Sequence, residues 1–132
     1  MHITLETDYA IRIVDLLARK AGRSEPLLDA KSISEQTGVS HRYALKILRK
    51  LVAGEIAGSH RGVYGGYRLL KKPEEISLYD VVEIMEGGYK FSRCLDKGYD
   101  CSCNDGLPCE YQNVFGEITE QVIDKLKQYK FG

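Results

Sequence analysis

Two short helical segments joined by a glycine, at residues 30–53, constrain the fold of this 132-residue chain more than any other feature. Residues 30–37 predict a helix that ends at Gly38, and Ser40 is a good N-cap for a second helix that reaches about Ala53. The apolar residues of the second helix recur at helical spacing and predict a buried face: Ala44, Ile47, Leu48, Leu51 and Val52. This arrangement is typical of a helix-turn-helix.

A glycine-rich hairpin follows the second helix directly. Residues 56–59 and 67–70 are short strand candidates on either side of a tip, residues 61–66, that reads Arg-Gly-Val-Tyr-Gly-Gly. Glycines permit the positive φ values of a tight turn and the close approach of another molecule. A basic strand pair after a helix-turn-helix is a wing. We therefore predict a winged helix-turn-helix over residues 1–76, with an earlier helix at about 7–20.

Residues 77–132 predict a second region with a linker helix capped by Ser77, a cysteine-rich loop at 90–109 and a long helix at 110–130. The long helix has apolar residues at spacings of four and three that resemble a coiled-coil seam: Tyr111, Phe115, Ile118, Val122, Leu126 and Tyr129. Because a lone terminal helix with such a seam needs a partner, we expect a dimerisation helix and a homodimer. The predicted fold class is mostly α.

Charge is segregated along the chain, although Lys and Arg together number 19 and Asp and Glu together also number 19. Residues 31–72 hold nine Lys or Arg against two Glu, which is a local net charge of +7. Residues 73–124 have a local net charge of −9. A basic segment beside an acidic one suggests a face that binds a polyanion, attached to a different module.

Several protein classes are not expected. No stretch approaches the roughly 20 apolar residues of a membrane helix, so no membrane partner is predicted. The start of the chain lacks the basic and apolar regions of a secretory signal, which predicts a cytoplasmic protein with reduced thiols. No paired carboxylates, nucleophile triad, P-loop or dinucleotide fingerprint stands out, so an enzyme is not expected.

The basic helix and wing predict DNA binding, because the second helix of a helix-turn-helix reads the major groove with its N-terminal residues. Arg42 can donate two hydrogen bonds to guanine, whereas Ser40 and Tyr43 more often contact phosphate. Lys50 is expected to strengthen binding to all DNA sequences alike. The alternative is a solvated cationic helix beside a hairpin that only packs; the charge segregation favours DNA. The predicted contacts on helix and wing are Ser40, His41, Arg42, Tyr43, Lys46, His60, Arg61 and Tyr64.

All four cysteines lie within sixteen residues: Cys94, Cys101, Cys103 and Cys109. Their spacing is neither the paired C-x2-C of a zinc ribbon nor the repeated C-x2-C of ferredoxins. A thiolate-rich loop favours an iron–sulfur cluster or zinc, and redox-active thiols are a third reading. A redox or electron-transfer protein, whose basic segment docks an acidic partner, is a more distant alternative. The residues alone leave these readings open.

Taken together, these residues resemble the IscR/NsrR-type winged-helix regulators, the Rrf2 family. The resemblance implies a homodimeric transcription factor that binds a palindromic operator and senses redox state, nitric oxide or cluster status. In cluster-binding members, three cysteines between the wing and the terminal helix hold an iron–sulfur cluster, [2Fe–2S] or [4Fe–4S]. The likeness rests on residues 7–10, which read Thr-Asp-Tyr-Ala, on residues 39–43, which read Val-Ser-His-Arg-Tyr, and on the wing at residues 61–67.

The same resemblance assigns the ligands. Cys94 matches the first family cysteine, Cys109 the third and Cys103 the second, while Cys101 is extra. IscR-type members place a histidine three residues after the last cysteine, where this chain has Gln112. In the family's nitric-oxide sensors, an aspartate from the first helix of the partner subunit completes the site, and Asp8 stands at that position. Asp8 and Cys101 are therefore alternative fourth ligands; on the residues alone, Asp8 only complements a helix dipole.

Overall fold

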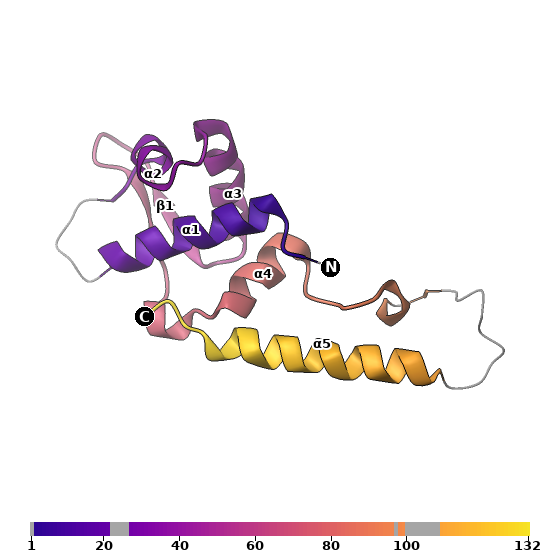
Figure 1. The fold of residues 1–132 in the computed structure, drawn as a ribbon. Coiled ribbons are helices and arrows are strands. Elements are labelled where there is room, and N and C mark those ends of the chain that lie inside the picture. The colour runs from indigo at the N-terminus through magenta and orange to yellow at the C-terminus, as the bar shows by residue number, and fades with distance from the viewer. Residues whose placement is uncertain (1, 22–26, 97, 100–108) are drawn as a thin grey trace.

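The structure is a computed structural model that describes residues 2–21, 27–96, 98–99 and 109–132. Within these residues, four α-helices and a two-stranded wing form one group, and a long fifth helix packs beside α4 near its C-terminal end and extends away from the group (Figure 1). The last residues of the chain lie back against the first group. The predicted class, a mostly α winged helix-turn-helix with a long C-terminal helix, is confirmed.

Three helices build the helix-turn-helix unit. Helix α1 (Leu5–Lys20) begins two residues earlier than predicted, because the side chain of Thr4 accepts a hydrogen bond from the Thr7 backbone and caps the helix. Helix α2 (Ala30–Thr37) is capped by Asp29, and helix α3 (His41–Ala53) by Ser40, as the sequence predicts for Ser40. The three helices meet around side chains with no exposed surface: Ile13, Val14, Ile33, Ile47 and Leu48.

The wing consists of β1 (Ala57–His60) and β2 (Gly66–Leu69), which pair antiparallel with His60 opposite Gly66. Both strands are shifted by one residue from the prediction. Leu28, which lies outside the two strands, adds a third short pairing through two backbone hydrogen bonds with Tyr67. Gly66 permits this pairing, because its φ is +155° and a Cβ atom there would lie 2.5 Å from the carbonyl oxygen of Leu28.

After the wing and the 3₁₀ turn η1 (Pro73–Glu75), helix α4 (Leu78–Glu86) begins with a capping box and packs on α1. A second 3₁₀ turn, η2 (Arg93–Leu95), precedes the long helix α5 (Glu110–Gln128).

Helix α5 ends two residues earlier than predicted, because the residues after it pair with the start of α4. The backbone N–H of Leu78 donates to Tyr129 O at 2.9 Å, and that of Phe131 donates to Ile76 O at 3.0 Å. Phe131 also packs on the core. None of the helices in the described residues is long and apolar enough to cross a membrane.

Candidate nucleic-acid interface and cysteine segment

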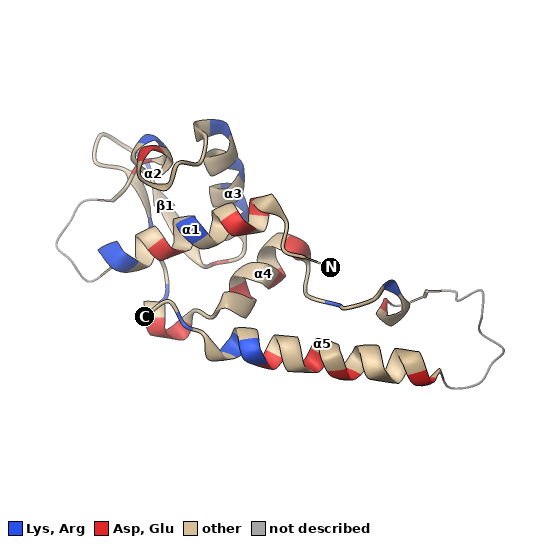
Figure 2. Cartoon of the chain, in the orientation of Figure 1, with Lys and Arg blue, Asp and Glu red and all other residues tan. Residues whose placement is uncertain are grey.

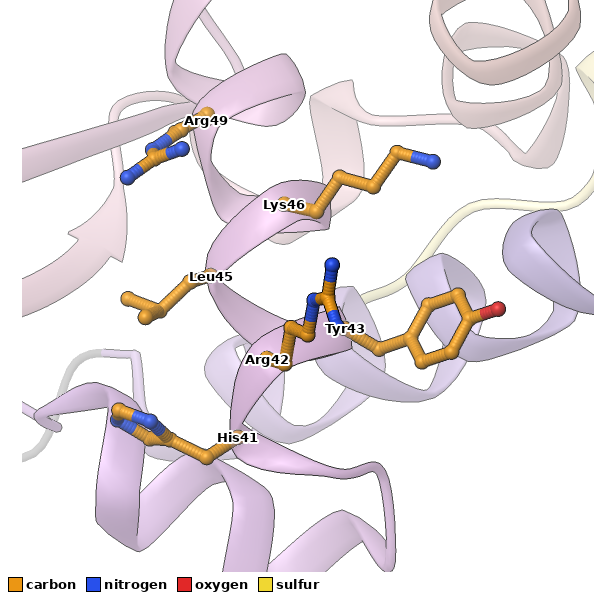
Figure 3. Close-up of a pocket in the computed structure, with 6 residues that line it drawn as sticks. All are labelled: His41, Arg42, Tyr43, Leu45, Lys46 and Arg49. Carbon is orange, nitrogen blue, oxygen red and sulfur yellow. The ribbon is translucent and has the colours of Figure 1, made fainter.

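The outer face of α3 is open to solvent and polar. Six of its residues line a shallow hollow: His41, Arg42, Tyr43, Leu45, Lys46 and Arg49 (Figure 3). Behind them Ala44, Ile47 and Leu48 are fully buried in the core, so the helix is fixed by its apolar face while its basic face stays accessible. Lys and Arg gather along α3, whereas Asp and Glu dominate most of α5 (Figure 2). The arrangement provides a rigid cationic surface that can approach a polyanion.

The first turn of α3 holds four of the predicted DNA contacts. Ser40 uses its hydroxyl to cap the helix, accepting a hydrogen bond from the Tyr43 backbone at 3.3 Å. The Tyr43 ring meets the ring of Tyr9 in α1 edge-to-face, with centroids 6.0 Å apart, and remains 47% exposed. His41 and Arg42 are exposed beside them, and Arg42 makes no ion pair with any described residue. The first turn is therefore braced by α1 and is open on its outer side.

Two lysines of α3 are paired with a glutamate of α1, a contact that sequence reasoning missed. Lys50 Nζ lies 2.8 Å from Glu6 Oε1, and Lys46 Nζ lies 3.6 Å from Glu6 Oε2. The hydrogen bond from Lys50 lowers the pKa of Glu6, and the two lysine charges lower it further against the opposing effect of burial. Glu6 lies 40 positions before Lys46 and 44 positions before Lys50, so no local sequence pattern signals this pairing.

The wing tip is the second exposed part of the predicted interface. His60, Arg61 and Tyr64 are all exposed, and Tyr64 retains 86% of its accessible surface. The neighbouring Val63 is 95% exposed. The tip closes with a hydrogen bond from the Gly65 N–H to Gly62 O. The three predicted wing residues therefore face solvent on a turn that is held by its own backbone.

The cysteine segment is fastened to α5 at its first described cysteine. Cys94 lies half-buried in η2, and Gln112 Nε2 donates a hydrogen bond to its backbone oxygen at 2.8 Å. Just before η2, the Phe91 backbone donates to Thr119 Oγ1 at 3.0 Å, and Thr119 is the buried residue of α5. Cys109 is exposed at the residue before α5 begins. Gln112, in the first turn of α5, thus ties the backbone of Cys94 to the helix end at which Cys109 lies.

The remaining predicted ligands are not assembled in the described part of the chain. Cys101 and Cys103 lie outside the described residues. Asp8 forms an ion pair with Arg12, Oδ2 to Nη2 at 2.9 Å, and its side chain is 48% exposed. In the described ranges no three His, Cys, Asp or Glu side chains form a group that could hold a metal ion. The donor chemistry nevertheless fits a thiophilic group, because both described cysteines are free thiols in one segment.

Known proteins resemble this chain over nearly its whole length. A sequence model of the Rrf2 family, described as an iron-dependent transcriptional regulator, matches residues 3–132. Protein aau3 of Rhizobium meliloti is 34% identical over 96% of this chain and 84% of its own length. The HTH-type transcriptional regulator NsrR of Bacillus licheniformis is 29% identical over 98% of this chain and 88% of its own.

Solved structures share the fold. CymR, described as the global cysteine regulator of B. subtilis, superposes with a TM-score of 0.79 at 23% identity, covering 99% of this chain and 93% of its own. IscR of T. potens superposes with a TM-score of 0.75 at 23% identity, covering 99% of this chain and 83% of its own. At this level of identity the likeness concerns the fold.

Proposed function

The chain belongs to the Rrf2 family of DNA-binding transcriptional regulators, a family of proteins that are generally not enzymes, and we propose that it is a homodimer whose operator affinity is controlled by an iron–sulfur cluster. Residues 1–76 form the DNA-binding part. Residues 77–132 supply the linker helix, the cysteine-rich loop and the dimerisation helix. The observation that supports this best is the combination of an open basic α3 with a thiol-bearing segment fastened to α5.

In this proposal α3 enters the major groove and the wing tip reaches the minor groove or the backbone. Arg42 is the base reader, because its guanidinium is exposed at the first turn, where helix-turn-helix proteins contact base edges. Ser40 and Tyr43 contact phosphate, together with the wing-tip residues Arg61 and Tyr64. His41, Lys46 and His60 complete the contact surface.

The homodimer forms through α5. Thr119 is the buried residue of this helix, whereas the predicted seam is left open. Tyr111 keeps 71% of its accessible surface and Tyr129, just beyond the helix, keeps 56%. The other seam residues are partly exposed: Phe115, Ile118, Val122 and Leu126. An apolar stripe that one subunit leaves exposed is usually covered by a second copy of the chain. Two subunits related by a twofold axis present two copies of α3, which suits a palindromic operator with half-sites about one helical turn or a multiple apart.

Cys94, Cys103 and Cys109 are the proposed cluster ligands, with Asp8 of the partner subunit or Cys101 as the fourth. When bound, the cluster would supply thiolate-ligated iron that responds to oxidation or nitric oxide. The side chain of Gln112 is already engaged with the backbone of Cys94, which favours a positioning role over a role as ligand. To serve the partner's site, Asp8 has to leave its ion pair with Arg12, an exposed pair that costs little to break.

Packed contacts connect the cysteine segment to α3. Gln112 fastens the backbone at Cys94 to α5, and Tyr129, just beyond α5, accepts a hydrogen bond from Leu78 at the start of α4. Helix α4 packs on α1, and α1 contacts α3 through Glu6. A rearrangement of the cysteine segment can therefore shift α3 in each subunit. Such coupling between sites is typically worth about 1–3 kcal/mol.

A second candidate is the same DNA-binding frame with structural zinc or a thiol-based redox switch in place of the cluster. The free thiol of Cys109 supports it, because an exposed cysteine is accessible to oxidants. Zinc would be held by the same cysteines.

Anaerobic purification followed by a visible absorption spectrum and iron, sulfide and zinc analysis tests the proposal. Brown protein with matched iron and sulfide is expected, and Cys94→Ser and Cys109→Ser should both abolish the colour. Cys101→Ser, Cys103→Ser and Asp8→Asn then identify the other ligands. Colourless protein that also resists anaerobic reconstitution would contradict the cluster, and stoichiometric zinc in that sample would support the second candidate.

A further inference from the structure

We propose that Glu6 limits the affinity of α3 for DNA of any sequence, because it neutralises part of the positive charge of the helix. The inference deepens the proposed function and rests on α3 being the helix that approaches DNA. It concerns the sequence-independent part of the affinity, which arises from phosphate contacts and the release of counterions.

The geometry divides the cations of α3 into two kinds. Lys50 and Lys46 both approach the carboxylate of Glu6, at 2.8 Å and 3.6 Å. Arg42 and Arg49, on the open face of the same helix, make no ion pair with any residue in the described ranges. The arginines are available to DNA, whereas the lysines are already shared with a carboxylate of the protein.

Glu6 is placed to keep its charge at this position. Its side chain is only 24% exposed, less than the 58% of Lys46 and the 40% of Lys50, so water screens it less than a surface carboxylate. The hydrogen bond from Lys50 lowers its pKa, so Glu6 is ionised at neutral pH.

A phosphate that approaches Lys46 or Lys50 therefore competes with a fixed negative charge. This competition weakens contacts that every DNA sequence offers equally, while base contacts by Arg42 are unaffected. Operator DNA and random DNA are therefore both bound more weakly than they would be without Glu6, by about the same factor. A carboxylate that instead oriented the lysines toward phosphate would have the opposite effect, because its removal would weaken DNA binding.

The experiment compares wild type, Glu6→Gln and Glu74→Gln by fluorescence anisotropy on a labelled duplex of random sequence, from 50 to 200 mM salt. Glu74 is an exposed acid in η1, so its substitution removes the same charge away from the Glu6 contact with α3. We expect Glu6→Gln to bind about three- to tenfold more tightly at 50 mM salt, with a log–log salt slope steeper by about one. Glu74→Gln should match wild type.

The same measurement on a duplex selected by the wild-type protein from a randomised pool should show a gain of about the same factor, because both duplexes offer the same phosphates. Glu6→Gln binding random DNA no more tightly than wild type, or Glu74→Gln gaining equally, would overturn the inference and leave DNA binding intact. Wild-type protein that binds no duplex at all would overturn the proposed function as well.

A second set of variants tests the inference without altering Glu6, in case Glu6→Gln does not fold. Lys50→Gln should lose less affinity for random DNA than Arg49→Gln, because the charge of Lys50 is already neutralised by Glu6 while that of Arg49 is not. A loss for Lys50→Gln that equals or exceeds the loss for Arg49→Gln would contradict the inference.

Discussion

The DNA-binding part together with helix α4, residues 4–86, forms a core that is stabilised differently from the cysteine arm, residues 88–128. Among the described residues, every buried hydrophobic side chain lies between Ala10 and Val82. The arm contributes Thr119 as its buried residue and leaves Tyr111 71% exposed. The core thus has its own hydrophobic interior, whereas the arm is held by a few hydrogen bonds and ring contacts. A region of this second kind depends on a partner or ligand and is suited to respond to either.

The largest expected effect is the loss of a core side chain. Leu48→Ala should lower the free energy of unfolding by about 2–5 kcal/mol, because Leu48 is fully buried and the substitution leaves a cavity. Val114→Ala, in the arm, should cost under about 1 kcal/mol, because Val114 is 45% exposed. Urea unfolding followed by circular dichroism measures both; equal losses would contradict the distinction between the two regions.

A charge introduced on the apolar stripe of α5 should weaken dimerisation while the core remains folded. Ile118→Asp would bury an unpaired carboxylate in the proposed dimer contact and should weaken dimerisation by about tenfold or more. Sedimentation equilibrium measures the association, and circular dichroism checks that the core remains folded. Asn113→Asp adds the same charge to an exposed position off the stripe and is the matched control. Unchanged association of Ile118→Asp would remove α5 as the dimerisation helix.

The third prediction concerns DNA recognition by the core alone. Arg42→Ala should lower affinity for a selected operator by about 1–3 kcal/mol, because it removes a guanidinium that can contact a base. The affinity of the variant for random-sequence DNA should change little. Fluorescence anisotropy on both duplexes measures the difference, and operator binding equal to that of wild type would exclude Arg42 as a reader.

The smallest expected effect is a pH dependence of the core's stability. The pKa of Glu6 is lowered chiefly by its hydrogen bond with Lys50, and that of Asp29 by the backbone of Ser32, so folding favours both ionised forms. Their contribution to stability is therefore complete above the ordinary carboxyl pKa and is lost as the pH falls through the lowered values. Urea unfolding at neutral pH and near pH 4 should show a smaller decrease for Glu6→Gln than for wild type. An identical decrease would rule out Glu6 as a source of the pH dependence.

Features of the fold that depend on local chemistry could be predicted from the sequence. Helix α2 occupies the predicted residues 30–37, and α3 begins after its predicted cap Ser40, because caps and glycine stops act within one turn. Strand β1 begins one residue later than predicted, because the Ile56 N–H donates to Leu51 O in the last turn of α3. Register in so short a hairpin depends on such tertiary contacts.

Contacts between distant residues could not be predicted. The pairing of Lys50 with Glu6, the hydrogen bond from Gln112 to Cys94 and the return of Phe131 to Ile76 all join segments without a shared local pattern. The predicted DNA contacts lie exposed on α3 and the wing, but their roles remain predictions. The ligand assignments also remain predictions, and two of them fall on Cys101 and Cys103, outside the described residues.

The most direct test of the account is an anaerobic anisotropy titration of one selected operator duplex, with protein that contains a reconstituted cluster and with the same protein after its removal. If the cysteine arm controls the DNA-binding core, the two dissociation constants should differ by about 5- to 150-fold. Cys94→Ser should give a single value that does not respond to reconstitution. Equal dissociation constants for the two wild-type samples would contradict the account, since the arm would then hold no influence over α3 and the wing.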